Sequence, residues 1–147
     1  MTELNFIFQP GIWLGSGTIT LVSSPEKINF YTKWTIQKEN QNKIESTQII
    51  EIDGVQEHIV NKYVFYEISE NDFKTVLESE HIGKVEGNGK KHDKCIEWHF
   101  KVPPLCIGNE LYEKNEDGSY SFKAEYGTEE AFESQIEGKL WLKSSDV

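Results

Sequence analysis

Apolar and polar side chains alternate with a period of two residues through most of this chain, and turn residues interrupt the alternation at short intervals. In the segment 28–37, the large apolar side chains fall on one face, while Asn29, Lys33 and Gln37 fall on the other. The segments 95–101 and 119–126 alternate in the same way. Because successive side chains of a strand point to opposite faces, each segment is predicted to be a strand with one buried face.

Turn-forming residues separate the predicted strands. Asp53-Gly54 and Asp117-Gly118 predict type I′ hairpin turns, because glycine tolerates a positive φ. Gly87-Asn88-Gly89 is interpreted as another tight reversal, and Pro103-Pro104 as a break, since proline cannot donate to a central ladder. Residues 128–130 are expected to start one helical turn. The predicted strands cover residues 12–22, 27–38, 43–53, 56–68, 73–80, 82–88, 92–101, 105–114, 119–127 and 134–143.

So many short strands joined by tight turns would leave exposed sheet edges unless the sheet closed on itself. The sequence therefore predicts an all-β fold, a single closed antiparallel up-and-down β-barrel of about ten strands. The whole chain, residues 1–147, is expected to form this one domain. A sandwich of two sheets is the alternative.

The charge of the chain narrows the classes of partner. Fifteen lysines and 25 acidic residues give a net charge of −10, which disfavours binding to nucleic acid or to anionic membranes. Since every basic residue is lysine, a planar guanidinium clamp for phosphate or carboxylate is excluded. The first residues lack the features of a signal peptide, and two cysteines form no disulfide framework, so a cytoplasmic location with free, buried thiols is expected. The oligomeric state stays open.

One local motif lies at the start of the first predicted strand. Gly11, Trp13, Gly15 and Gly17 form the pattern GxWxGxG, in which the tryptophan can plug a barrel end and the glycines permit close approach of a neighbouring strand. The motif resembles that of the calycin superfamily, and in its fuller form that of nitrobindin-like and fatty-acid-binding-protein-like barrels. This resemblance implies a lipocalin-like barrel that encloses a ligand.

The chain departs from those families at their binding residues. Nitrobindin-like proteins hold haem through a histidine in the C-terminal part of the barrel, whereas the last histidine here is His99. The interior arginines of fatty-acid-binding proteins are absent as well. Glu97 and His99 share a strand face, but two ligands do not make a zinc site. We therefore predict no cofactor and no metal, and assign no catalytic residue.

The favoured hypothesis is a binding protein for a small, largely apolar molecule held inside the barrel. Either Asn61 or Lys62 is expected to point inward, and an inward Lys62 would bind an anion or act as a nucleophile. The candidate ligand-binding residues are Phe30, Thr32, Trp34, Lys62, Trp98, Phe100, Phe122 and Tyr126.

Two other classes of function stay open. The first is an enzyme of the isomerase, dehydratase or chromophore-lyase type, with tyrosines such as Tyr66 or Tyr112 as proton carriers. The second is an interaction module whose barrel is filled by its own aromatic side chains. An empty apolar cavity would favour the binding protein, converging titratable groups would favour the enzyme, and a filled interior would favour the module.

Overall fold

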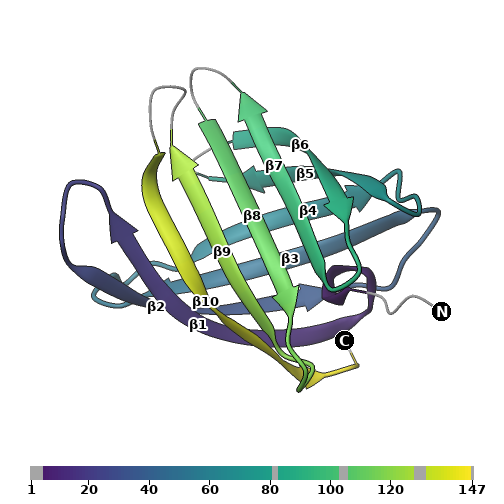
Figure 1. Cartoon of the computed structure of the whole chain (residues 1–147), viewed down its shortest axis with the longest axis horizontal. Helices are drawn as coiled ribbons and strands as arrows, with labels where there is room; N and C mark the ends of the chain where they lie inside the picture. The colour runs from purple at the N-terminus through teal and green to yellow at the C-terminus, as the bar shows by residue number, and fades with distance from the viewer. Residues whose placement is uncertain (1–4, 81–82, 103–105, 128–131, 147) are drawn as a thin grey trace.

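The computed structural model describes residues 5–80, 83–102, 106–127 and 132–146. Over these residues the chain forms one short 3₁₀ helix and a closed barrel of ten strands, which confirms the all-β barrel (Figure 1). Each strand pairs antiparallel with its neighbours in sequence, and the last strand pairs with the first. The elements are η1 (Phe6–Phe8), β1 (Gly11–Leu21), β2 (Lys27–Ile36), β3 (Lys43–Ile52), β4 (Ile59–Tyr66), β5 (Asp72–Ser79), β6 (Gly83–Lys91), β7 (Cys95–Val102), β8 (Cys106–Lys114), β9 (Tyr120–Gly127) and β10 (Phe132–Ser144).

The alternation read from the sequence decides which side chains lie inside the barrel. On β2, Phe30, Thr32 and Trp34 are buried, whereas Asn29 and Lys33 are exposed. The inward and outward faces of β7 and β9 also follow the predicted pattern. Because cross-strand partners share a face, the alternation of inward and outward side chains continues from strand to strand around the whole barrel.

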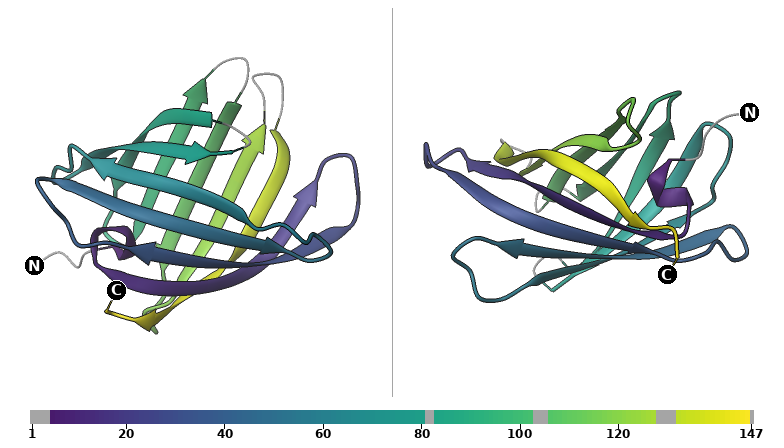
Figure 2. Two further views of the ribbon diagram at one scale, coloured as in Figure 1. Left: turned by 180° about the vertical axis from the view of Figure 1, so that it is seen from behind. Right: turned by 90° about the horizontal axis from the view of Figure 1, so that it is seen from below.

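The helix η1 closes one end of the barrel, at the end where the chain termini also lie (Figures 1 and 2). Phe6 is fully buried there, with its ring centroid 5.6 Å from that of Trp13 and 5.1 Å from that of Tyr120. The rings of Trp34 and Tyr112 lie at 5.7 and 5.0 Å from the same phenyl group. Such tilted and edge-to-face contacts are favourable beyond the area they bury. This half of the barrel is therefore a packed aromatic core.

Two glycines of the GxWxGxG motif allow β10 to lie close against β1. A Cβ atom at Gly15 would come within 2.7 Å of the Lys139 carbonyl oxygen, and one at Gly17 within 2.1 Å of the Glu137 carbonyl oxygen. A side chain at either position would therefore push the last strand away from the first. The seam that closes the barrel depends on these glycines.

The prediction of a turn at Gly87-Asn88-Gly89 is wrong, because these residues lie inside β6. Gly87 pairs with Phe100 and Gly89 with Trp98 on β7. The glycines make room for aromatic rings, since a Cβ atom at Gly89 would lie 2.0 Å from Cζ of Phe73. Glycine within a strand marks the close approach of another group here, and not a reversal of the chain.

The turn types also differ from the prediction. Gly54 and Gly118 have φ values of 83° and 90°, but neither Asp53 nor Asp117 has a positive φ, so these are hairpin turns of another type than I′. A turn with two successive positive φ values occurs instead at Gln41 and Asn42, with φ of 53° and 60°.

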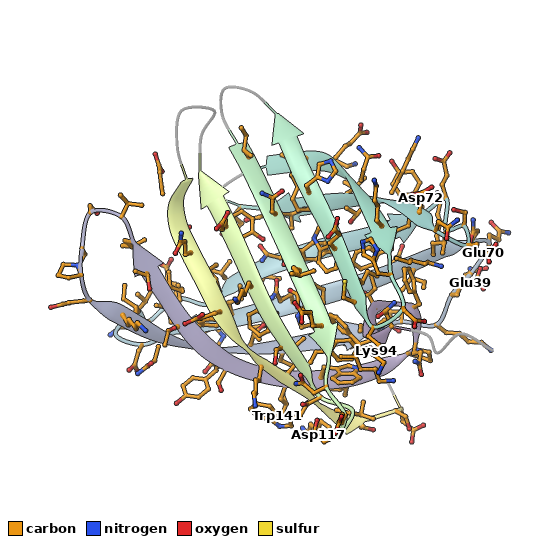
Figure 3. All side chains as sticks on the ribbon, in the orientation of Figure 1. Glu39, Glu70, Asp72, Lys94, Asp117 and Trp141 are labelled. Carbon is orange, nitrogen blue, oxygen red and sulfur yellow. The ribbon has the colours of Figure 1, made fainter. Side chains whose placement is uncertain are left out.

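Charged turns surround the closed end of the barrel. Figure 3 labels Glu39, Glu70 and Lys94, which lie on the β2–β3, β4–β5 and β6–β7 turns, and Asp117 on the β8–β9 turn. These side chains are exposed, as expected for solvated hairpin ends. In the part of the chain that the structure describes, no helix has the length and apolar character needed to span a membrane.

Cys95 has a free thiol and is half-buried rather than buried. Its partner on the neighbouring strand is Glu113. The predicted helical turn at 128–130 lies outside the described residues.

Candidate ligand-binding cavity

The half of the barrel away from η1 is hollow. A cavity of about 230 Å³ lies between the later parts of β1, β3 and β5, the first parts of β2 and β4, and β8–β10. Most of its wall is apolar and comes from Ile19, Phe30, Ile50, Ile59, Leu77, Phe122, Ala124 and Ile136; the remaining lining residues are Gln48, Asn61, Ser79, Glu110, Tyr112 and Tyr126. Concave, largely apolar sites with a few polar groups are typical of small-molecule binding.

Glu110 on β8 brings a carboxyl group into this apolar interior, where only 4% of the residue is exposed. The Tyr63 hydroxyl and the Trp98 indole N–H donate to its Oε2 atom at 2.9 and 2.8 Å. The Tyr112 hydroxyl donates to Oε1 at 2.8 Å, and the Tyr126 side chain also hydrogen-bonds the carboxyl group. Four donors from β4, β7, β8 and β9 thus meet on one carboxyl group at the floor of the cavity.

Burial and hydrogen bonding act in opposite directions on the pKa of Glu110. Desolvation raises the pKa of the carboxyl and outweighs the hydrogen bonds from the three tyrosines and Trp98, which lower it. Burial, together with the nearby carboxyl group, raises the pKa values of Tyr63, Tyr112 and Tyr126 well above 10.0. The phenols therefore keep their protons and remain hydrogen-bond donors at neutral pH.

A row of polar side chains lies on the opposite side of the interior. Gln48 Nε2 donates to Thr32 Oγ1 at 3.2 Å, and Asn61 Nδ2 donates to Gln48 Oε1 at 3.1 Å. This row crosses β2, β3 and β4, and β3 is separated from β8 by equal numbers of strands in both directions around the barrel. The cavity thus has a carboxyl group on one side and amides on the other.

The sequence-predicted residues divide between the cavity and the packed core. Phe30, Phe122 and Tyr126 line the cavity, and Thr32 ends the polar row. Trp98 is buried beneath the cavity and donates to Glu110, while Trp34 and Phe100 are buried core residues that do not line it. The sequence left two alternatives open, a hollow interior and a filled one. The barrel contains both, a cavity and a packed core.

The prediction that places Lys62 among the interior residues needs correction. The Lys62 side chain is exposed, and its neighbour Asn61 lines the cavity. Register explains the difference: Asn61 pairs with Gln48 on β3, and both side chains face inward. A strand with apolar side chains on both faces, as here, does not reveal its inner face from sequence alone.

Glu110 was not predicted to be an interior residue, because neither face of β8 is apolar. Ile107 and Leu111 lie on one face, and Gly108, Glu110 and Tyr112 on the other. The signal that identifies it is hairpin pairing: Trp98, whose inward position was predicted, pairs with Glu110. Cross-strand partners share a face, so a buried tryptophan places this carboxyl group inside.

A larger hollow of about 410 Å³ lies on the outer face of β7–β9. Its side chains include Glu97, His99 and Lys123, which belong to the outward-facing positions of these strands. We assign the candidate site to the inner cavity because its wall is apolar and its single carboxyl group is buried.

The pair Glu97 and His99 does not form a shared site in this structure. Glu97 Oε2 instead lies 3.7 Å from Nε2 of His92, and both side chains are about half exposed. Within the described ranges, no three histidine, cysteine or acidic side chains lie close enough together to hold a metal ion.

Comparison with known proteins identifies the fold without a function. No protein-family model matches the chain, and no curated protein matches its sequence. Among solved structures, the chain is similar to the crystal structure of Rv2717c from M. tuberculosis, with a TM-score of 0.72 and 11% sequence identity over 94% of each chain. At this identity the similarity shows a common barrel fold, and the site must be interpreted from its own residues.

Proposed function

We propose that the protein binds a small, largely apolar organic molecule in the cavity at the open end of the barrel. The observation that carries this proposal is the hollow half of an otherwise packed interior, with polar groups at defined places in an apolar wall. About 230 Å³ is small for a ligand site. An apolar cavity of about 150 Å³ nevertheless suffices for benzene, so a single-ring or short-chain ligand fits.

Two further features support this proposal. The hairpins at the open end carry exposed apolar side chains, Val22 with 76% and Val55 with 53% of its surface exposed, which suits an entrance for an apolar ligand. The GxWxGxG motif at Gly11–Gly17 supports placement among calycin-like barrels, which enclose ligands in this manner.

The test is a substitution in the cavity lining that fills the cavity. Ala124→Phe adds an aromatic ring inside the cavity, and Lys123→Phe adds the same ring on the exposed outer face of the same strand. A panel of single-ring and short-chain compounds is screened by thermal shift and by calorimetry. We expect at least one compound to bind the wild type and Lys123→Phe with equal affinity. Its affinity for Ala124→Phe should be lower by about tenfold or more. No binding from the panel, or equal binding to all three proteins, would overturn the proposal.

The convergence of Glu110 and three tyrosines in the cavity favours a second function, an enzyme that moves a proton. A buried carboxyl group with a raised pKa in a cavity is suited to act as a general base toward an acidic C–H bond of a bound ligand. The phenols of Tyr112 and Tyr126 would stabilise an oxyanion by hydrogen bonding.

Proton transfer of this kind is detected without knowledge of the natural substrate. Small aryl ketones are incubated with the protein in D₂O, and loss of the signal of the α-proton is followed by NMR. The enzyme function predicts exchange faster than in buffer for the wild type and loss of that acceleration in Glu110→Gln. Equal rates with both proteins would leave ligand binding as the only function of the cavity.

A further inference from the structure

We infer that the ligand is a small organic amine, and that its protonated nitrogen lies beside Glu110 while its apolar body fills the cavity. This inference rests on the proposed function and adds the chemical class of the ligand. It follows from the hydrogen bonds of Glu110, from the charges around the cavity and from the aromatic groups in its wall.

The hydrogen bonds around Glu110 suit a carboxylate. An ionised carboxylate is only an acceptor, with about four lone-pair positions, and here it receives the Trp98 indole N–H and three phenol side chains. The indole N–H cannot accept a proton, so its 2.8 Å contact to Oε2 requires an acceptor oxygen at that atom. A carboxylate can accept all four of these hydrogen bonds at once, whereas a protonated acid would have to use one oxygen as a donor to a tyrosine hydroxyl.

The described residues that line the cavity supply no positive charge to balance this carboxylate. The described residues that line the cavity include no lysine, and the chain contains no arginine. Lys62, the lysine that the sequence offered as an interior residue, is exposed on the outer face. A buried charge without an opposite partner is costly, so a ligand that brings a positive charge gains both an ion pair and the relief of that cost.

The wall beside the carboxylate also suits an organic cation. Phe30, Phe122, Tyr112 and Tyr126 contribute aromatic groups to the cavity, and aromatic faces attract ammonium groups. A tyrosine hydroxyl both donates and accepts, so Tyr126 can accept an N–H of the ligand while it donates to Glu110. The net charge of −10 favours the approach of cations and opposes that of anions.

The experiment compares three ligands of nearly equal shape that differ in charge: phenethylamine, phenethyl alcohol and phenylpropionate. Their affinities are measured by calorimetry at neutral pH for the wild type, Glu110→Gln and Glu113→Gln. Glu113 is the matched control, because it lies three residues away on the same strand, on the opposite face, and is exposed. We expect the wild type and Glu113→Gln to bind the amine about tenfold or more tightly than the alcohol, and Glu110→Gln to bind the two about equally.

The outcomes separate this inference from the proposed function. Equal binding of amine and alcohol by the wild type would overturn the amine inference and leave the cavity as a binding site. Tightest binding of phenylpropionate would overturn it as well, and would indicate a protonated Glu110. Absence of binding by all three probes would count against both. The comparison of amine with alcohol in the wild type tests the inference by itself, so the test holds even if Glu110→Gln does not fold.

Discussion

At the scale of single residues, Glu110 and Gly89 show how the interior of the barrel constrains its own sequence. Glu110 is held by donors from four strands and still has a raised pKa, because desolvation is the larger effect. Gly89 is required for the opposite reason, since the ring of Phe73 occupies the space that its side chain would fill. Substitution of either residue should change the stability of the protein in a defined way.

Glu110 should make the stability of the ligand-free protein fall as the pH rises. The folded-state pKa lies above the ordinary value of 4.5, so between these two values the folded protein binds more protons than the unfolded chain. The free energy of unfolding therefore decreases with rising pH in this window, by at most about 1.4 kcal/mol per pH unit. Urea unfolding of the wild type and Glu110→Gln at several pH values measures the effect as a difference. A difference that grows in favour of the wild type with rising pH would mean that the folded-state pKa is lowered.

Gly89→Ala should destabilise the barrel by about 1–3 kcal/mol, because the new methyl group overlaps the buried ring of Phe73. Asn88→Ala on the exposed face of the same strand is the control, with an expected change within about 0.5 kcal/mol. Combining Gly89→Ala with Phe73→Leu should cost less than the sum of the two single changes. Strict additivity in denaturant unfolding would show that the two positions do not interact.

At the scale of the elements, the strands were predictable and their inner faces only partly so. The ten predicted segments correspond to β1–β10, because alternation and short connections are local properties of the sequence. Gly87 and Gly89 were misassigned to a turn, because a glycine that accommodates a distant ring has the same local signal as a turn glycine. Glu110 was missed because its burial depends on donors from three other strands, which no local pattern of β8 reveals.

The helix η1 is the element that the alternation did not predict. Its contribution to the core can be tested by truncating one of its side chains. Phe6→Ala should destabilise the protein by about 3–5 kcal/mol, since the fully buried ring contacts four other aromatic rings. Tyr31→Ala, at a position with 59% exposure on β2, should change the stability by less than about 0.5 kcal/mol. Guanidinium unfolding compares the two variants. Equal effects would show that η1 does not contribute to the packed end.

At the scale of the whole molecule, the barrel combines a packed half with a hollow half. The aromatic core beneath η1 fixes the closed end, and Glu110 with its four donors lies where the core meets the cavity. Side chains of the same kinds, isoleucine and phenylalanine, occur in both halves, so composition alone does not distinguish them. The distribution of interior volume therefore places the proposed binding site at the open end.

Methyl NMR of isotope-labelled isoleucine tests this assignment most directly, because the chain carries isoleucines in both halves. Phenethylamine is titrated into the wild-type protein, and the shifts of the methyl signals are followed. We expect shifts at the cavity residues Ile19, Ile50, Ile59 and Ile136, and almost none at Ile7, Ile36, Ile44 and Ile96, which are buried in the core. Shifts of equal size in both groups, or no shifts at saturating ligand, would contradict a binding site in the open half of the barrel.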